Sequence, residues 1–158
     1  MSRHLPILVL FLFTSIFSVA QDTRGGLLPD TQVALLDGSA AAEDLNVGSE
    51  IWTWMPGEKP ASAKVTAIRR VHADSYILLK AGKTQLGATG SHRVVLADGT
   101  LTRLDTIKVG QQIVSWSPKG KVDLLVTDIR VYPASLIAYD LTVEGHRTFL
   151  AGGVLVGD

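Results

Sequence analysis

The chain has 158 residues, which is enough for one domain with a hydrophobic core. Its 15 basic and 15 acidic residues balance, so no field of one sign favours nucleic acid or an anionic membrane, and we expect no nucleic-acid partner. The absence of cysteine excludes disulfides, thiolate nucleophiles and a lipid-modified N-terminal cysteine.

The first 20 residues have the pattern of a cleavable signal peptide. A short polar head with Arg3 and His4 precedes an almost entirely apolar run over residues 7–17, and small residues lead to Ala20. The apolar run is shorter than the ~20 residues that a membrane-spanning helix needs. The pattern predicts cleavage near Ala20–Gln21 and a secreted or periplasmic protein, with an uncleaved anchor as the alternative. Residues 21–25 then form a short segment before one domain over residues 26–158.

The remainder of the chain predicts an all-β domain. Strand-length segments rich in Val, Ile, Leu and Thr alternate with Asp-Gly, Val-Gly and Pro-Gly turn signals. In chain order these segments cover residues 31–38, 49–54, 63–71, 75–81, 92–99 and 149–156. Only residues 40–46 fit a helical turn, and every segment is too short for a free-standing helix.

The sequence also contains an internal repeat with an offset of 61 to 62 residues. The matched pairs include Asp37 and Asp98, Val47 and Val109, Ile51 and Ile113, Trp54 and Trp116, and Ile68 and Ile129. Such a duplication predicts a compact β fold of two similar halves, closed to limit exposed strand edges. Trp54 and Trp116 are expected in the core or at the junction between the halves.

Three segments resemble the Hint family, which includes inteins, Hedgehog C-terminal domains and bacterial pre-toxin autoprocessing domains. Residues 27–54 resemble the opening block, with its Thr, Asp-Gly and Leu-x-Val-Gly pattern. The stretch ATGSH, residues 88–92, matches the Thr-x-x-His motif, and residues 138–156 match the closing block. The resemblance implies a horseshoe-like, pseudo-twofold Hint fold over residues 26–158. It also implies protein autoprocessing, in which an N–S or N–O acyl shift leads to self-cleavage or splicing.

The resemblance assigns three retained positions. In the family, a first-position Cys or Ser attacks the preceding carbonyl, and the Thr and His of the second motif bond to that peptide. The His also protonates the leaving amine. Thr89 and His92 match these two residues. Asp140 matches the closing-block Asp, which helps to position the nucleophile.

Four family positions carry substituted residues, namely Gly26, Arg147, Gly157 and Asp158. Counting back from Thr31 places the nucleophile at Gly26, which has no side chain. Arg147 stands where the family commonly has a His, with His146 one place early. Gly157 and Asp158 stand where inteins have a penultimate His and a terminal Asn. The family activity is single-turnover autoprocessing, and these substitutions predict that this copy is inactive.

The alternative is a non-catalytic secreted β domain that acts as a binding or structural module for an unknown protein partner. In either case we expect a monomer without a cofactor. A zinc site of His72, His92 and His146 lacks recognisable ligand spacing. Arg69, Arg70 and Arg130 are expected to be solvated charges on strand faces.

Overall fold

The computed structural model of the protein describes residues 25–157. The predicted signal peptide, the segment 21–24 and Asp158 lie outside these residues. No helix of residues 25–157 is long and apolar enough to cross a membrane. The strands are β1 (Gln32–Leu35), β2 (Gly38–Ala41), β3 (Glu50–Trp54), β4 (Ala61–Ala81), β5 (Thr84–Ala88), β6 (Arg93–Val95), β7 (Leu101–Arg103), β8 (Gln112–Ser117), β9 (Gly120–Val143), β10 (Thr148–Ala151) and β11 (Val154–Gly157). Short 3-10 turns are η1 (Ala42–Asp44), η2 (Leu104–Thr106) and η3 (Glu144–His146).

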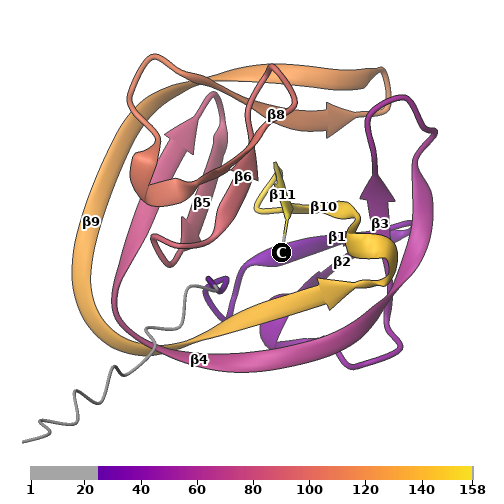
Figure 1. Ribbon diagram of the computed structural model, residues 1–158, viewed down its shortest axis with the longest axis horizontal. Helices are drawn as coiled ribbons and strands as arrows, with labels where there is room; N and C mark the ends of the chain where they lie inside the picture. Colours follow the sequence, from indigo (N-terminus) through magenta and orange to yellow (C-terminus); the bar gives the residue numbers. More distant parts are fainter. Residues whose placement is uncertain (1–24, 158) are drawn as a thin grey trace, which may run out of the picture.

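All these strands belong to one antiparallel sheet, which confirms the all-β prediction. Its path is β7-β6-β11-β10-β3-β4-β9-β8, and β1, β2 and β5 branch from it. Figure 1 shows β4 and β9 curving around the outside of the molecule, with the end of β11 near the middle. The horseshoe arrangement therefore brings the end of β11 inside the frame that the two long strands make.

The predicted break between residues 63–71 and 75–81 is wrong, because β4 runs through both segments. β4 pairs with β9 from Val65↔Val143 to Ala81↔Val126, with three register shifts along the way. Such irregularities bend a strand and increase its local twist without ending it. They let two long strands wrap around the core as one ribbon.

The two halves repeat their local structure, which confirms the duplication. Each half has a 3-10 turn followed by a glycine with positive φ, which is 92° at Gly48 and 97° at Gly110. The amide of Gly48 donates to the Val65 carbonyl at 2.7 Å, and that of Gly110 donates to the Val126 carbonyl at 2.9 Å. The same conformation and the same bond thus recur at the repeat offset.

The prediction of one strand over residues 149–156 is also wrong. Gly152 and Gly153 adopt φ values of 59° and 80° and join β10 to β11 as a two-residue hairpin. Two consecutive positive φ values are those of the turn that matches the strand twist, and glycine adopts them without strain. The closing block therefore supplies two neighbouring core strands.

The tryptophans lie at the junction of the halves, as predicted. The ring centroids of Trp54 on β3 and Trp116 on β8 are 5.0 Å apart, and Trp52 lies 5.5 Å from Trp116. All three rings are partly buried, and those of Trp52 and Trp54 pack against a small apolar cluster that includes Val114. The aromatic contacts thus join equivalent strands of the two repeats.

Candidate functional site

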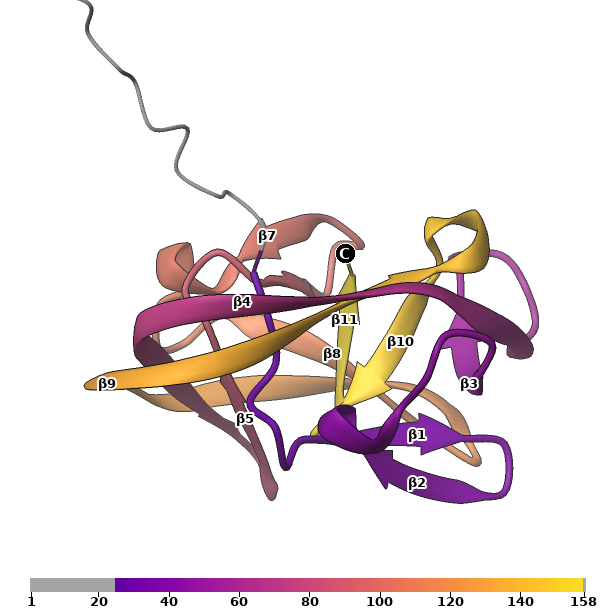
Figure 2. The same ribbon diagram turned by 90° about the horizontal axis from the view of Figure 1, so that it is seen from below.

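The first described residues, 25–28 (the entry segment), run between β5 and β9, where Leu27 forms isolated β-bridges to Ala88 and Tyr139. Leu27 and Tyr139 exchange both backbone hydrogen bonds at 2.8 Å, and the Leu28 amide donates to the Gly87 carbonyl at 3.2 Å. Leu27 is fully buried and belongs to the main core. Figure 2 shows this segment passing β5 on its way to β1. Residues 25–28 are therefore part of the core structure.

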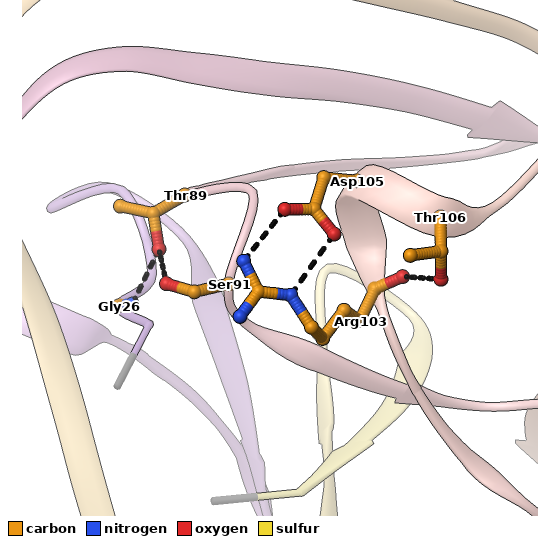
Figure 3. Close-up of polar contacts among 6 residues, drawn as sticks. All are labelled: Gly26, Thr89, Ser91, Arg103, Asp105 and Thr106. Atoms are coloured by element: carbon orange, nitrogen blue, oxygen red, sulfur yellow. Dashed lines mark hydrogen bonds and ion pairs between the residues drawn. The ribbon is translucent and has the colours of Figure 1, made fainter. Parts of the chain in front are cut away.

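Thr89 holds this segment at Gly26. The Gly26 amide donates to the Thr89 hydroxyl oxygen at 2.9 Å, and the Thr89 amide donates to the Gly26 carbonyl at 2.9 Å. Thr89 is buried, and its hydroxyl lies 3.5 Å from that of Ser91 (Figure 3). A hydroxyl thus accepts from the nitrogen of the Gly25–Gly26 peptide, the bond that the resemblance marks as the reacting one.

The internal repeat extends upstream of Asp37, because the turns over residues 28–31 and 89–92 are equivalent. The Thr31 amide donates to the Leu28 carbonyl at 3.1 Å, and the His92 amide donates to the Thr89 carbonyl at 3.1 Å. The carbonyls of Thr31 and His92 then accept the first amides of η1 and η2, both at 2.8 Å. The chain thus uses the same turn twice, and only the second copy carries the Thr-x-x-His residues.

His92 lies directly against Gly25. His92 is 3% exposed, and a Cβ placed on Gly25 would stand 2.1 Å from the His92 backbone nitrogen and 2.3 Å from its Cα. Real side chains do not come this close, so only glycine fits there without a shift of the backbone. The structure therefore brings Thr89 and His92 together at the two residues of the Gly25–Gly26 peptide.

Gly26 has no room for a side chain in this arrangement. A Cβ placed on Gly26 would lie 2.7 Å from the Ala138 Cβ, 2.9 Å from the Tyr139 nitrogen and 3.0 Å from the Ala138 carbonyl carbon. Ala138 is fully buried on β9. The position that the resemblance assigns to the nucleophile is thus closed by packing against β9, a feature that the sequence alone does not indicate.

Asp140 is buried on the same strand, two residues after Ala138. Because strand side chains alternate, Asp140 shares the face of β9 that Ala138 presents to Gly26. Asp140 is 5% exposed, and its Oδ2 lies 3.7 Å from Nε of Arg69, which is opposite it on β4. Arg69 is 40% exposed, in keeping with a solvated face charge, and it also lies against a buried carboxylate, which the sequence alone does not indicate.

An ion pair supports the turn that carries Thr89 and His92. Arg103 donates from Nε and Nη2 to the two carboxylate oxygens of Asp105, at 3.1 and 2.7 Å (Figure 3). The Asp105 amide donates to the Gly90 carbonyl at 2.9 Å. The hydrogen bond from Arg103 is the main cause that lowers the pKa of the Asp105 carboxyl from its ordinary 3.8. The equivalent positions in the other half are Ala41 and Glu43, so the ion pair is specific to this copy.

The structure places the remaining predicted positions differently. Arg147 donates to the Thr53 hydroxyl at 2.7 Å and to the Glu58 carboxylate at 2.6 Å, so it bonds to β3 and the loop after it. Gly157 is buried at the end of β11, where it pairs with Arg93, the residue after His92. The end of β11 therefore adjoins the Thr89–His92 turn, whereas Arg147 makes none of its hydrogen bonds with the turn.

Metal ligation has no evident donor set in residues 25–157, where no group of three or more His, Asp or Glu residues is placed to hold an ion. The chemistry available at the Gly25–Gly26 peptide is therefore that of Thr89, His92 and the nearby buried carboxylate of Asp140. These groups can orient and polarise a peptide bond, but position 26 supplies no attacking atom.

Comparison with solved structures identifies the architecture. The bacterial intein-like domain of Clostridium thermocellum matches with a TM-score of 0.76 and 18% identity over 84% of this chain and 98% of that one. The DnaB intein of Synechocystis sp. PCC 6803 matches with a TM-score of 0.76 and 24% identity over 84% and 97% of the two chains. The chain has the Hint fold. The TvoVMA intein agrees, with a TM-score of 0.75 and 19% identity over 86% and 98%.

Sequence comparison adds nothing to this result, since no family model and no curated protein matches the chain. The Hint fold accounts for the arrangement around Gly26, because it brings the start of the domain, the Thr89–His92 turn and the end of β11 together. Fold alone does not establish activity, which depends on the residues of the site.

Proposed function

We propose that this protein is an exported Hint-fold domain of the autoprocessing type that no longer cleaves itself. The observation that carries the proposal is the pair Gly26 and Ala138. Acyl shift requires a hydroxyl or thiol one bond beyond the Cβ of position 26, and that Cβ position lies 2.7 Å from the Ala138 Cβ. Both the attacking group and the space for it are missing.

Retention of the other groups gives the proposal its second part. The Gly25–Gly26 peptide is still bonded by Thr89 and packed against His92, with Asp140 buried nearby. In a site without a nucleophile these groups hold the entry segment in the fold and drive no covalent step. We propose that the domain now acts as a monomeric binding or structural module outside the cell.

The direct test is an intact-mass assay of the Gly25–Gly26 bond. A reporter protein replaces residues 1–20, and the fusion is incubated with a thiol or with hydroxylamine at neutral pH. We expect an unchanged mass under every condition. Appearance of a fragment that begins at Gly26, at a rate lowered by His92→Ala, would overturn the proposal.

Export is tested separately. The full chain, expressed with its own N-terminus, is expected outside the cytoplasm with a new N-terminus near Gln21, as N-terminal sequencing of the recovered protein would report. Recovery of full-length protein in the cytoplasmic fraction alone would contradict this part and leave the cleavage result unaffected.

A further inference from the structure

The duplicated halves each contain one Asp-Gly turn, Asp37-Gly38 at the start of β2 and Asp98-Gly99 before β7. At such a pair the glycine nitrogen can attack the aspartate Cγ, expel water and close a five-membered succinimide. Water then reopens the ring at either carbonyl and yields aspartate or isoaspartate. Glycine favours the closure because it has no Cβ to obstruct it. The two turns occupy equivalent places in the repeat, so each is a control for the other.

The Asp98 carboxylate is held away from this reaction. Its Oδ1 accepts the Thr100 amide at 2.9 Å and the Thr100 hydroxyl at 2.7 Å. The nitrogen that would attack, that of Gly99, donates to the Leu96 carbonyl at 2.8 Å. The Thr100 hydroxyl is also the largest cause that lowers the pKa of the Asp98 carboxyl, which disfavours the protonated form that loses water. Ring closure here must first break several hydrogen bonds.

The Asp37 carboxylate lacks the bonds that Thr100 makes to Asp98, while Gly38, like Gly99, is held in its hairpin, where it pairs with Leu35. Asp37 is exposed, and its side chain makes no hydrogen bond or ion pair with any residue of 25–157. The residue equivalent to Thr100 is Ser39, whose hydroxyl donates to the Gln32 Oε1 at 2.9 Å instead. The Gln32 amide is in turn oriented by a bond from Nε2 to the Asp30 carbonyl at 3.3 Å. Gln32 on β1 therefore accepts the Ser39 hydroxyl, whereas the equivalent Thr100 hydroxyl bonds to the Asp98 carboxylate.

We propose that Asp37 is a site of spontaneous isoaspartate formation and that Asp98 is protected from it. The product keeps the mass and the carboxylate charge, and it adds one methylene to the main chain at the turn between β1 and β2. β2 pairs only with β1 among the described strands, and Figure 2 shows this hairpin at the margin of the molecule. The modified protein thus keeps its core and becomes a methyl acceptor for isoaspartyl methyltransferases, enzymes that recognise this linkage.

The test ages the purified full chain at neutral pH and follows isoaspartate by methyltransferase labelling, with the site assigned by electron-transfer fragmentation of peptides. We expect label at Asp37 several-fold above that at Asp98. The matched control Asp37→Glu keeps the charge but cannot close a five-membered ring, so it should remove the label from this turn. Thr100→Val removes the hydroxyl bond and should raise the label at Asp98.

Three results would overturn the proposal. These are equal or greater label at Asp98 in the unmodified chain, label that persists in the first turn of the Asp37→Glu variant, and no isoaspartate at either turn. Circular dichroism of the aged protein accompanies the assay. Label at Asp37 that appears only as the fold is lost would also count against the proposal, because the difference between the turns belongs to the folded protein.

Discussion

Gly26 and Thr89 are joined by two hydrogen bonds that run in opposite directions across 63 residues of sequence. One of them uses the threonine hydroxyl, so the side chain that the Hint resemblance marks as catalytic also binds the backbone of the entry segment. This backbone contact gives Thr89 a structural role that does not depend on a reacting side chain at position 26.

Replacement of Thr89 by valine keeps the shape of the side chain and removes the acceptor. The buried Gly26 amide then has no partner from this side chain, and we expect the free energy of unfolding to fall by about 1–3 kcal/mol. Thr89→Ser keeps the oxygen and should retain most of the stability. Denaturant unfolding measures the difference, and amide exchange at Gly26 should accelerate in the valine variant only. Equal behaviour of the two variants would show that the hydroxyl bond contributes nothing.

The repeat and the short motifs predict the main features of the fold and the place of the site. The Asp-Gly and Val-Gly signals mark real turns, and ATGSH lies against Gly25 and Gly26 as the resemblance implies. These features are visible because turn chemistry and duplication are local properties of a sequence. The assignment of catalytic roles to Thr89, His92 and Asp140 remains a prediction.

Other features depend on contacts between distant segments, which no local pattern specifies. Ala138 fills the space beside Gly26 because β9 pairs with the entry segment there, through the bridge between Leu27 and Tyr139. The apolar residues around Gly152-Gly153 predict one continuous strand, whereas the pair forms the turn of the β10–β11 hairpin. The contact between Arg69 and Asp140 is not predictable from local pattern, because the two residues are 71 positions apart in the sequence and adjacent only in the sheet.

Truncation of Leu27 tests whether the entry segment is part of the core. It is fully buried, so Leu27→Ala should lower the free energy of unfolding by about 2–5 kcal/mol. The matched control is Leu101→Ala, because Leu101 is 44% exposed and its truncation should cost clearly less. Urea denaturation of both variants measures the two values. Equal losses would mean that residues 25–28 do not contribute to the core as the structure indicates.

The steric contact between positions 26 and 138 is tested by a double-mutant cycle. Gly26→Ala adds the Cβ that Ala138 and Tyr139 oppose, and overpacking of this kind should cost about 1–3 kcal/mol of stability. Ala138→Gly removes one of the opposing groups, so the double variant should be more stable than the sum of the single effects predicts. Additive losses in thermal or chemical unfolding would refute a direct contact.

The Arg103–Asp105 pair predicts a pH dependence of stability. The pKa of Asp105 is lower in the folded protein than its ordinary 3.8, so the pair contributes above that pH and is lost as the pH falls through the folded pKa. Both side chains are more than a third exposed, so solvent screening keeps the contribution of the pair small. Asp105→Asn should lower stability at neutral pH and approach the unmodified protein in strong acid. A constant difference at all pH values in urea unfolding would contradict this cause.

Restoring the nucleophile is the strongest test of how much of the autoprocessing site survives. Gly26→Cys alone should not release an upstream reporter, because the new Cβ meets Ala138 at 2.7 Å and is forced out of place. Gly26→Cys with Ala138→Gly removes the Ala138 Cβ and leaves the backbone approaches of Tyr139 and residue 138, at 2.9 and 3.0 Å, to be relieved by a small shift of β9. We expect hydroxylamine to release the reporter from this double variant, with Thr89 and His92 acting on the Gly25–Gly26 bond. His92→Ala in the double variant should abolish release, and Asp37→Glu, at the remote turn, should leave it unchanged. Intact-mass spectrometry reads the result. A double variant that folds yet stays intact would mean that Thr89 and His92 now serve only to hold the entry segment.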